Sequence, residues 1–304
     1  MSRIVVTGAT SMIGVALIEE AVSQGDEVYA LVRNNSSRID RIPKSDKIHV
    51  VECDLGDMGN IEDLGVSCDV FYHFAWNYTD QQGRKDPALQ SKNIGTTLEA
   101  VELAHRLECH RFVGAGSQAE YGIVEDVISA DTIANPQIPY GIAKCAAGKL
   151  AQRLCEKYGM EFVWGRIFSV YGRFDNEWTM LNTSIDKFLK GEEANFSAAT
   201  QMWNYLNEHD AGRIFYLLGT CEGVSGIYCV ANPESKRLRE YIEEMASLFG
   251  NTAKCVFAQE DPDNKPVSLN ADVEKLLVDT GFTPRVSFAD GIKEVIEYRR
   301  NRKV

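Results

Sequence analysis

The sequence predicts an α/β protein in which a doubly wound parallel sheet carries a smaller C-terminal α/β cap. Three features predict this fold class. Short apolar, β-branched runs alternate with helical segments through the first 170 residues, as in strand–helix–strand units. The first strand leads through a glycine-rich turn directly into a helix. After about residue 171 the alternation is lost, and loops rich in Asn and Gly separate a few helices.

Each element is predicted from its own periodicity. Residues 4–6 are apolar and favour a buried strand, whereas residues 13–22 place apolar side chains at helical spacing. Further strands are predicted at residues 27–32, 48–52, 69–74, 111–115 and 161–167, and helices at 93–108 and 140–158. Later in the chain we expect helices near 237–248, 271–280 and 288–299, and a strand within 203–230 that can return to the sheet.

Composition and charge place the chain among soluble globular proteins. It has 304 residues, of which 44% are hydrophobic and 25% charged, as is usual for a protein with a sizeable core. The 44 acidic residues outnumber the 32 Lys and Arg residues, and the formal net charge is -12. We therefore expect no binding to nucleic acid or to an acidic membrane, because both need a basic surface.

The N-terminal sequence and the spacing of the cysteines indicate the cellular compartment. The spacing of the histidines indicates whether a metal site is present. The chain enters a strand pattern directly and has no run of ~18 apolar residues, so we expect neither a signal peptide nor a membrane span. The eight cysteines form no CxxC pair, and the five histidines lack metal-ligand spacing. We expect a cytoplasmic protein with buried thiols and no metal site.

A glycine-rich turn joins the first strand to the first helix, where residues 7–14 read T-G-A-T-S-M-I-G. In a dinucleotide-binding fold such a turn lets the helix N-terminus face the pyrophosphate. It resembles the T-G-x-x-G-x-x-G loop of the extended short-chain dehydrogenases, the NAD(P)-dependent nucleotide-sugar epimerase/dehydratase family, with Ser11 at the middle glycine. The loop residues expected to bind the cofactor are Gly8, Thr10, Ser11, Met12, Ile13 and Gly14.

The resemblance also implies a domain organisation and an oligomeric state. Residues 1–170 are expected to form a Rossmann-type dinucleotide-binding domain, and residues 171–304 mainly a substrate-binding cap. Members of the family usually form homodimers through two helices of each subunit. The stretch of small and apolar residues at 143–154 is compatible with such a dimer.

Residues after the second strand bear on the choice of cofactor. An acidic residue there takes the ribose 2′-hydroxyl of NAD, whereas an arginine accommodates the 2′-phosphate of NADP. This strand ends at Arg33, with Arg38 close behind and no carboxylate between them. The sequence therefore favours NADP over NAD, although Arg33 has the alternatives of stacking on adenine or facing water.

Two further segments resemble cofactor-binding motifs of the family. Asp54 and Leu55 match a D-L pair whose Asp contacts adenine. Phe74 and Ala75 belong to an H-x-A motif that lines the cofactor, and Trp76 follows directly. We expect all five residues to contact the dinucleotide, and we expect Trp76 also to form a wall of the sugar pocket.

Tyr140 and Lys144 open the long helix predicted at residues 140–158. At a spacing of four they share one helical face, where an ammonium can stabilise a phenolate. The resemblance implies that Ser117, four residues before a Tyr-Gly pair, is the catalytic serine that polarises the substrate while Tyr140 exchanges the proton. Tyr140 and Lys144 are also expected to contact the cofactor, and Asn93 matches the asparagine that supports the lysine.

The residues after Ser117 bear on the reaction. Sugar 4,6-dehydratases of the family carry an acidic pair there, but this chain has Gln118 and Ala119, which cannot act as acid or base. The epimerase-reductases acting at C3 and C5 carry a cysteine at the position of Ala119. Two reactions at C4 of a hexose remain: a 4-ketoreductase that uses exchangeable NADPH, and a 4-epimerase that retains NAD. Arg33 favours the ketoreductase.

The implied substrate is a nucleotide sugar, but two family residues that hold its diphosphate are replaced. Ser169 stands where Asn is usual and Trp203 where Arg is usual, so Arg173 or Arg213 is expected to take over the diphosphate. The expected substrate-binding residues are Trp76, Ser117, Gln118, Ser169, Arg173 and Trp203. A carbonyl substrate without a nucleotide, and a cofactor-sensing protein without turnover, stay open as alternatives.

Overall fold

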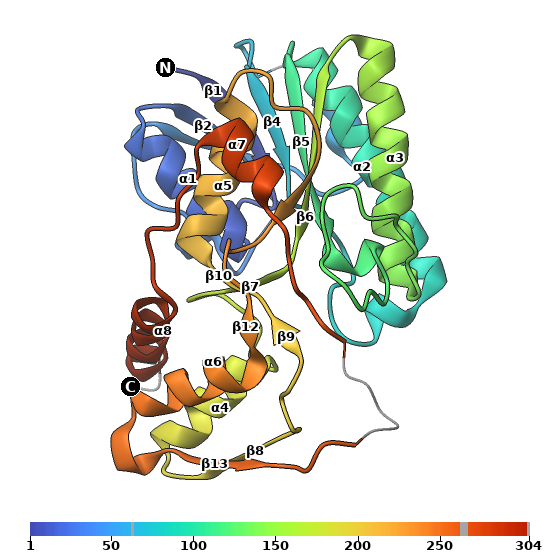
Figure 1. Cartoon of the computed structure of the whole chain (residues 1–304). Coiled ribbons are helices and arrows are strands. Elements are labelled where there is room, and N and C mark those ends of the chain that lie inside the picture. The colour runs from blue at the N-terminus through green and yellow to red at the C-terminus, as the bar shows by residue number, and fades with distance from the viewer. Residues whose placement is uncertain (62–63, 262–266, 303–304) are drawn as a thin grey trace.

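A seven-stranded, wholly parallel sheet forms the centre of the molecule (Figure 1). The structure is a computed structural model that describes residues 1–61, 64–261 and 267–302. The strands of this sheet are β1 (Arg3–Thr7), β2 (Glu27–Val32), β3 (Ile48–Glu52), β4 (Val70–His73), β5 (Arg111–Ser117), β6 (Glu161–Ile167) and β11 (Gly226–Val230). Their order is β11-β6-β5-β4-β1-β2-β3. The order reverses between β1 and β4, so the doubly wound fold predicted from the sequence is confirmed.

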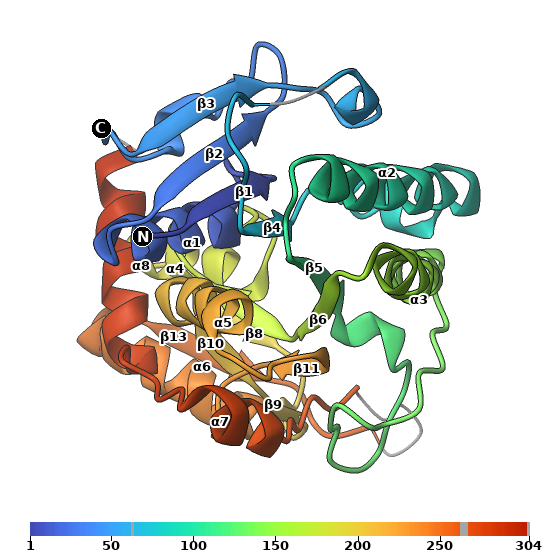
Figure 2. The same cartoon turned by 90° about the horizontal axis from the view of Figure 1, so that it is seen from above.

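Helices cover both faces of this sheet (Figure 2). One face is covered by α2 (Pro87–Arg106) and α3 (Pro139–Tyr158), and the other by α1 (Met12–Ser23), α5 (Glu208–Thr220) and α7 (Glu274–Thr280). The strands are apolar on both faces for this reason: Val5 packs into the α2–α3 core, while its neighbours Ile4 and Val6 pack into the core of the opposite face.

The helix predicted at residues 93–108 begins earlier, at Pro87. The Asp86 carboxylate accepts a hydrogen bond from the backbone N–H of Leu89 at 3.0 Å, and Pro87 occupies the first helical position. An Asp cap followed by a proline is a favourable helix start. The predicted boundary was therefore six residues late, because this local signal precedes the apolar periodicity.

Residues after 171 contribute to both parts of the molecule. The smaller part has its own core and contains β7 (Ser169–Tyr171), α4 (Met180–Leu189), β8 (Glu193–Phe196), β9 (Met202–Trp203), β10 (Tyr205–Asn207), β12 (Lys236–Arg237), α6 (Leu238–Ser247), β13 (Lys254–Phe257) and α8 (Phe288–Arg302). Three two-stranded pairs form there: β7 with β10, β8 with β13, and β9 with β12. Between them the chain returns to the large sheet, where β11 lies beside β6 and α5 packs on α1. Residues 262–266 and 303–304 of the predicted cap lie outside the described residues.

Short 3-10 turns connect several of these elements. They are η1 (Ile39–Arg41), η2 (Met58–Asn60), η3 (Gly83–Lys85), η4 (Gln118–Glu120) and η5 (Gly250–Thr252). Both η3 and η4 lie close to α3, so they border the helix that carries the predicted catalytic pair. Within the described ranges, no helix is long and apolar enough to cross a membrane.

Candidate active site

The glycine-rich turn between β1 and α1 forms one wall of a cleft of about 330 Å³ at the carboxyl ends of the strands. Gly8 has a positive φ of 68°, and a side chain there would place its Cβ 2.7 Å from the backbone N of Ala75. Only glycine suits this position. Ser11 caps α1, because its Oγ accepts a hydrogen bond from the N–H of Gly14 at 3.1 Å. The serine at the usual glycine position therefore stabilises the start of the helix.

Most of the predicted cofactor residues line this cleft. Those that do are Gly8, Thr10, Ser11, Arg33, Asp54, Leu55, Phe74, Ala75 and Trp76. Met12, Ile13 and Gly14 lie in the first turn of α1 and are not among the lining residues. Tyr140 and Lys144, which were also predicted to contact the cofactor, are not among them either. The lining residues that had not been predicted are Thr7, Ala9, Leu31, Val32, Cys53, Met58, Asn77, Tyr78 and Thr79; Arg38, noted only as a neighbour of Arg33, also lines the cleft. A glycine cradle and a helix N-terminus fit a dinucleotide, and Leu31, Val32, Leu55 and Met58 add apolar lining.

Two arginines face the far end of the cleft. Arg33 and Arg38 are exposed lining residues, and neither forms an ion pair with a carboxylate in the described part of the chain. Asp54, the nearest acidic lining residue, accepts hydrogen bonds from the backbone N–H of Asn34 at 3.0 Å and from its side chain at 3.3 Å. Asp54 thereby holds the turn after β2 that presents Arg33.

Tyr140 and Lys144 lie in the first turns of α3 beside Trp76. Lys144 is buried, and its Nζ donates a hydrogen bond to the carbonyl oxygen of Ala115 at 2.6 Å. The same Nζ is 3.7 Å from the centre of the Trp76 ring, and that ring meets the ring of Tyr140 edge-on at 6.1 Å. Burial lowers the pKa of Lys144 to about 7, because a charged ammonium is costly in an apolar surrounding.

Ser117 ends β5 directly opposite this pair. Its Oγ accepts a hydrogen bond from the N–H of Ala119 at 3.2 Å. Burial, the largest influence, raises the pKa of Tyr140 above its ordinary value, although the nearby Arg84 cation and the Ser117 hydroxyl both act to lower it. The structure thus brings Ser117, Tyr140 and Lys144 together at one end of β5, as a proton-transfer site requires.

Trp164 of β6 sets the distance between β5 and α3. A Cβ added to Gly114 or Gly116 of β5 would clash with its indole, and a Cβ on Gly148 of α3 would lie 2.7 Å from it. Three glycines therefore make room for one large side chain between the strand that carries Ser117 and the helix that carries Tyr140. Any larger residue at these positions would move the two apart.

Glu120 fixes the turn that follows Ser117. Its Oε1 accepts hydrogen bonds from the backbone N–H of Ser117 at 2.8 Å and from Trp164 Nε1 at 3.0 Å, and its Oε2 accepts one from Arg166 Nε at 2.9 Å. Glu120 and Arg166 are 1% and 4% exposed. This buried ion pair uses both carboxylate oxygens, so the acid nearest to Ser117 has a structural role.

Asn93 supports the site through the loop after β4. Its Oδ1 accepts a hydrogen bond from the N–H of Asn77 at 2.8 Å, and its Nδ2 donates one to the Asn77 carbonyl at 3.2 Å. One turn earlier, Gln90 Oε1 accepts a hydrogen bond from Trp76 Nε1 at 2.9 Å. In this structure Asn93 holds the segment that carries Trp76, and Trp76 in turn packs against Lys144.

The structure adds two residues that the sequence did not single out. The guanidinium carbon of Arg84, in η3, lies 4.6 Å from the centre of the Tyr140 ring and 6.0 Å from that of Trp178. Trp178 comes from the loop between β7 and α4. Neither residue belongs to a motif or a periodic segment, so only the folded chain shows that they border Tyr140.

The predicted substrate residues are not gathered in one place. Arg173 is not among the residues that line the cleft, and it pairs with Glu19 of α1 at 3.0 Å and with buried Glu208 of α5 at 2.5 Å. Its role as a diphosphate ligand stays a prediction, and these two carboxylates compete for its guanidinium. Arg213 donates to the Thr283 carbonyl at 2.6 Å. Of the remaining residues, half-buried Gln118 lies in η4, Ser169 in β7 and Trp203 in β9.

Comparisons with known proteins agree with this geometry. Residues 4–231 match the model of the NAD dependent epimerase/dehydratase family. A dTDP-glucose 4,6-dehydratase from Streptomyces niveus is 24% identical over 316 residues, which cover 99% of this chain and 94% of the relative.

Solved structures share the whole fold. MoeE5 in complex with UDP-glucuronic acid and NAD has a TM-score of 0.83 at 22% identity, with 99% of both chains covered. A UDP-glucuronic acid 4-epimerase from Bacillus cereus in complex with NAD also has a TM-score of 0.83, at 20% identity, with 99% of this chain and 100% of that chain covered. Because the family match spans more than half of the sequence and includes the glycine-rich turn, Ser117, Tyr140 and Lys144, the chain belongs to the NAD dependent epimerase/dehydratase family and is an enzyme of the extended short-chain dehydrogenase type.

Proposed function

We propose that this enzyme is an NADP-dependent nucleotide-sugar 4-ketoreductase. One observation carries the proposal: Tyr140 lies close enough to Ser117 for the serine hydroxyl to influence its pKa, while Glu120, the acid that follows Ser117, is held in a buried ion pair with Arg166. Such a site can move a proton to or from one oxygen. Among the described residues that follow Ser117, none offers the second, freely titrating acid or base that an elimination needs.

The roles of the side chains follow from their positions. The reduced nicotinamide, when bound, supplies hydride to the carbonyl carbon of the substrate. The Tyr140 hydroxyl donates its proton to the carbonyl oxygen, and the Ser117 hydroxyl donates a hydrogen bond to the same oxygen, so the ketone becomes an alcohol. Tyr140 is left as a phenolate and regains a proton from solvent. The cations that surround it stabilise this charge in the interval.

The similarity to a dehydratase does not extend to the residues that such chemistry uses. Gln118 and Ala119 supply neither an acid nor a base, and Glu120 is held by Arg166, Trp164 and the Ser117 backbone. Protonating or displacing Glu120 would leave Arg166 as a buried, unpaired charge, which is strongly unfavourable. We therefore do not assign a dehydration to this site.

The preference for NADP rests on the far end of the cleft. Arg33 and Arg38 line it without carboxylate partners in the described residues, and a ribose 2′-phosphate is the part of the cofactor that calls for arginine. Asp54 is bonded to Asn34 and forms no ion pair with either arginine in the part of the chain that the structure describes. An acidic protein that binds NADP needs such a local concentration of positive charge.

A 4-epimerase that retains NAD is the second candidate. In that reaction Tyr140, assisted by Ser117, would take a proton from the sugar hydroxyl. It would return the proton after the keto sugar has rotated to present its other face. Similarity to 4-epimerases, including a UDP-glucose 4-epimerase from Thermotoga maritima with a TM-score of 0.83 at 20% identity, favours this reading. The similarity between this chain and the 4-epimerases is a similarity of fold. Arg33 bears directly on the cofactor, and for that reason we place the ketoreductase first.

The amount of cofactor that copurifies separates the two candidates. The freshly purified protein is denatured and the released nicotinamide dinucleotide is quantified, and thermal shifts with NADPH and NADH are then compared. A protein that is nearly empty and stabilised mainly by NADPH supports the ketoreductase. About one NAD per chain, retained through purification, refutes it in favour of the epimerase.

We further propose that the protein forms a homodimer through α2 and α3, which lie side by side on one face of the sheet (Figure 2). Ile142 and Leu150 of α3 are 51% and 47% exposed and, at this spacing, share one helical face. Light scattering after size exclusion should give twice the chain mass. Leu150→Glu should give the single-chain mass, and a wild-type monomer would contradict the proposal.

A further inference from the structure

We propose that Arg84 is a positioning residue that supplies a permanent positive charge to the Tyr140 phenolate, a role that Lys144 does not fill alone in this chain. The inference deepens the proposed function and rests on it, because the phenolate forms when Tyr140 gives up its proton. Nothing in the sequence motifs assigns a role to Arg84, which lies in the irregular segment between β4 and α2.

The geometry places a guanidinium against the face of the catalytic ring. The guanidinium carbon of Arg84 is 4.6 Å from the Tyr140 ring centre, within the range of a cation–π contact. Its Nε is buried and has no hydrogen-bond partner among the residues that the structure describes. A buried donor without an acceptor is costly, so the packing here holds a cation against an aromatic ring at the expense of one hydrogen bond.

The carboxylates that face this region do not pair with Arg84. Asp80 is exposed, and its carboxylate accepts hydrogen bonds from the N–H groups of Gln82 and Gly83 at 3.0 and 2.9 Å. Glu120 is paired with Arg166. Among the described residues, no ion pair joins Arg84 to either acid. Its charge acts to lower the pKa values of Tyr140 and Lys144 and also that of the exposed Asp80, where solvent screens the interaction.

Lys144 is a weaker source of charge at neutral pH. Burial and the proximity of Arg84 bring its pKa to about 7, and its Nζ is already bonded to the Ala115 carbonyl above the Trp76 ring. A lysine with such a pKa is partly neutral at pH 7 and mostly neutral at pH 8. A guanidinium stays charged over this whole range, so Arg84 provides the constant part of the positive field.

Contacts on both sides hold Arg84 in place. On the sheet side, Gln90 Nε2 donates a hydrogen bond to the Gly83 carbonyl at 3.0 Å, which anchors η3. On the cap side, Trp178 lies 6.0 Å from the guanidinium. Arg84 thus sits between the Rossmann part and the cap, at the junction where Tyr140 meets the substrate.

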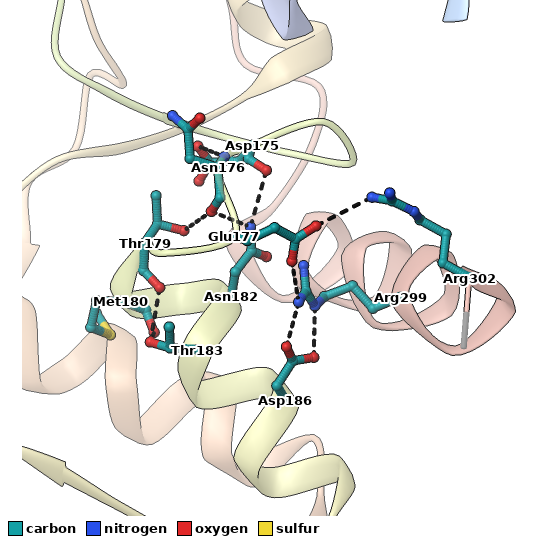
Figure 3. Close-up of polar contacts among 10 residues, drawn as sticks. All are labelled: Asp175, Asn176, Glu177, Thr179, Met180, Asn182, Thr183, Asp186, Arg299 and Arg302. Atoms are coloured by element: carbon teal, nitrogen blue, oxygen red, sulfur yellow. Dashed lines mark hydrogen bonds and ion pairs between the residues drawn. The ribbon is translucent and has the colours of Figure 1, made fainter. Parts of the chain in front are cut away.

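The loop that carries Trp178 is fixed from behind by the ion pairs in Figure 3. Glu177 accepts hydrogen bonds from Arg299 Nη2 at 2.7 Å and from Arg302 Nη1 at 3.2 Å, both on α8. Arg299 also pairs with Asp186 of α4. Two arginines of α8 thus bind Glu177, the residue next to Trp178, and Asp186 of α4 binds one of them, Arg299. These contacts fix the loop that brings Trp178 to Arg84.

The test is a pH titration of Tyr140 that needs no substrate. The protein is labelled at tyrosine Cζ with carbon-13 and examined by NMR with and without NADP; the Tyr140 signal is identified by its loss in Tyr140→Phe. Replacing Arg84 by Gln should raise the pKa of Tyr140 by about one unit or more, which is the usual effect of removing one adjacent cation. Arg84→Lys should restore at least half of the shift. Lys85→Gln removes the same charge from the exposed neighbouring residue and should leave the pKa of Tyr140 unchanged.

Two results would overturn the proposal. The first is an equal pKa of Tyr140 in the wild type and in folded Arg84→Gln. The second is a wild-type Tyr140 that stays protonated up to the alkaline unfolding transition, because the charge of Arg84 would then be without effect on it. A failure to reduce nucleotide sugars would instead count against the proposed function and would leave this titration valid.

Discussion

The two parts of the molecule are built by different means. In the Rossmann part the cleft beside the glycine-rich turn is built by backbone: a positive-φ glycine, a capped helix N-terminus and the carboxyl ends of four neighbouring strands. In the cap, three separate two-stranded pairs and several helices surround an aromatic core. The residues expected from the sequence to bind the substrate come from separate elements. This contrast teaches that a backbone-built site can be recognised from short motifs, whereas a site assembled from side chains of distant segments cannot.

The largest effect should come from the proposed proton donor, which lies on α3 beside Trp76. Tyr140→Phe removes the proton donor and should lower turnover by a factor of ~10² or more, the usual scale for a general acid. The dissociation constant of NADPH, measured by fluorescence, should change little because the ring and its contacts with Trp76 remain. Turnover near the wild-type value would exclude Tyr140 from the mechanism.

A matched pair of glycines tests the claim that backbone builds the cleft. Gly8→Ala and Gly191→Ala both place a side chain at a positive φ, 68° and 70°, at a cost of about 1 kcal/mol each. Only Gly8 faces a close neighbour, whereas nothing lies within 4 Å of a Cβ on Gly191. Titration with NADPH should therefore show about tenfold or greater loss for Gly8→Ala alone. Equal losses in the two variants would contradict the comparison.

Replacing Arg33, in the same cleft, should have a smaller effect on cofactor binding and tests the preference for NADP. Arg33→Asp should weaken NADPH binding by about tenfold, since a charge-assisted bond to the 2′-phosphate at an exposed site is worth about 1.5 kcal/mol, the lower end of the usual range, and should affect NADH far less. Arg213→Asp serves as the control because Arg213 lies outside the cleft. A similar loss for NADPH and NADH with Arg33→Asp would refute the assignment of NADP.

The smallest functional effect should come from Arg173. Because it pairs with Glu19 and Glu208 away from the cleft, Arg173→Met should leave the KM for the sugar substrate within about twofold. It should nevertheless lower the free energy of unfolding by about 1–3 kcal/mol, since buried Glu208 loses its cation. A large rise in KM with unchanged thermal stability would place Arg173 in the substrate site.

Several predicted residues proved to act through other groups. Ser11 caps α1, Asp54 holds the turn that bears Arg33, and Asn93 holds the loop that bears Trp76. Their motif positions were recognisable in the sequence, but the partner of each hydrogen bond lies up to 20 residues away and is chosen by how the loops pack. The early start of α2 was missed for a simpler reason, because the Asp86-Pro87 cap was overlooked.

The sequence by itself determined the doubly wound sheet, the glycine cradle and the grouping of Ser117, Tyr140 and Lys144. These features depend on local periodicity and on short spacings within or next to single elements, which the parallel sheet then brings to one edge. Only the tertiary structure decided which arginines pair with carboxylates and which one lies against Tyr140. Arg173 is neutralised by Glu19 and Glu208, and Arg84 reaches Tyr140 from a segment 56 residues earlier in the chain. The reason is physical: an arginine's effect depends on whether a carboxylate or an aromatic ring meets it after folding, and that contact is set by long-range packing.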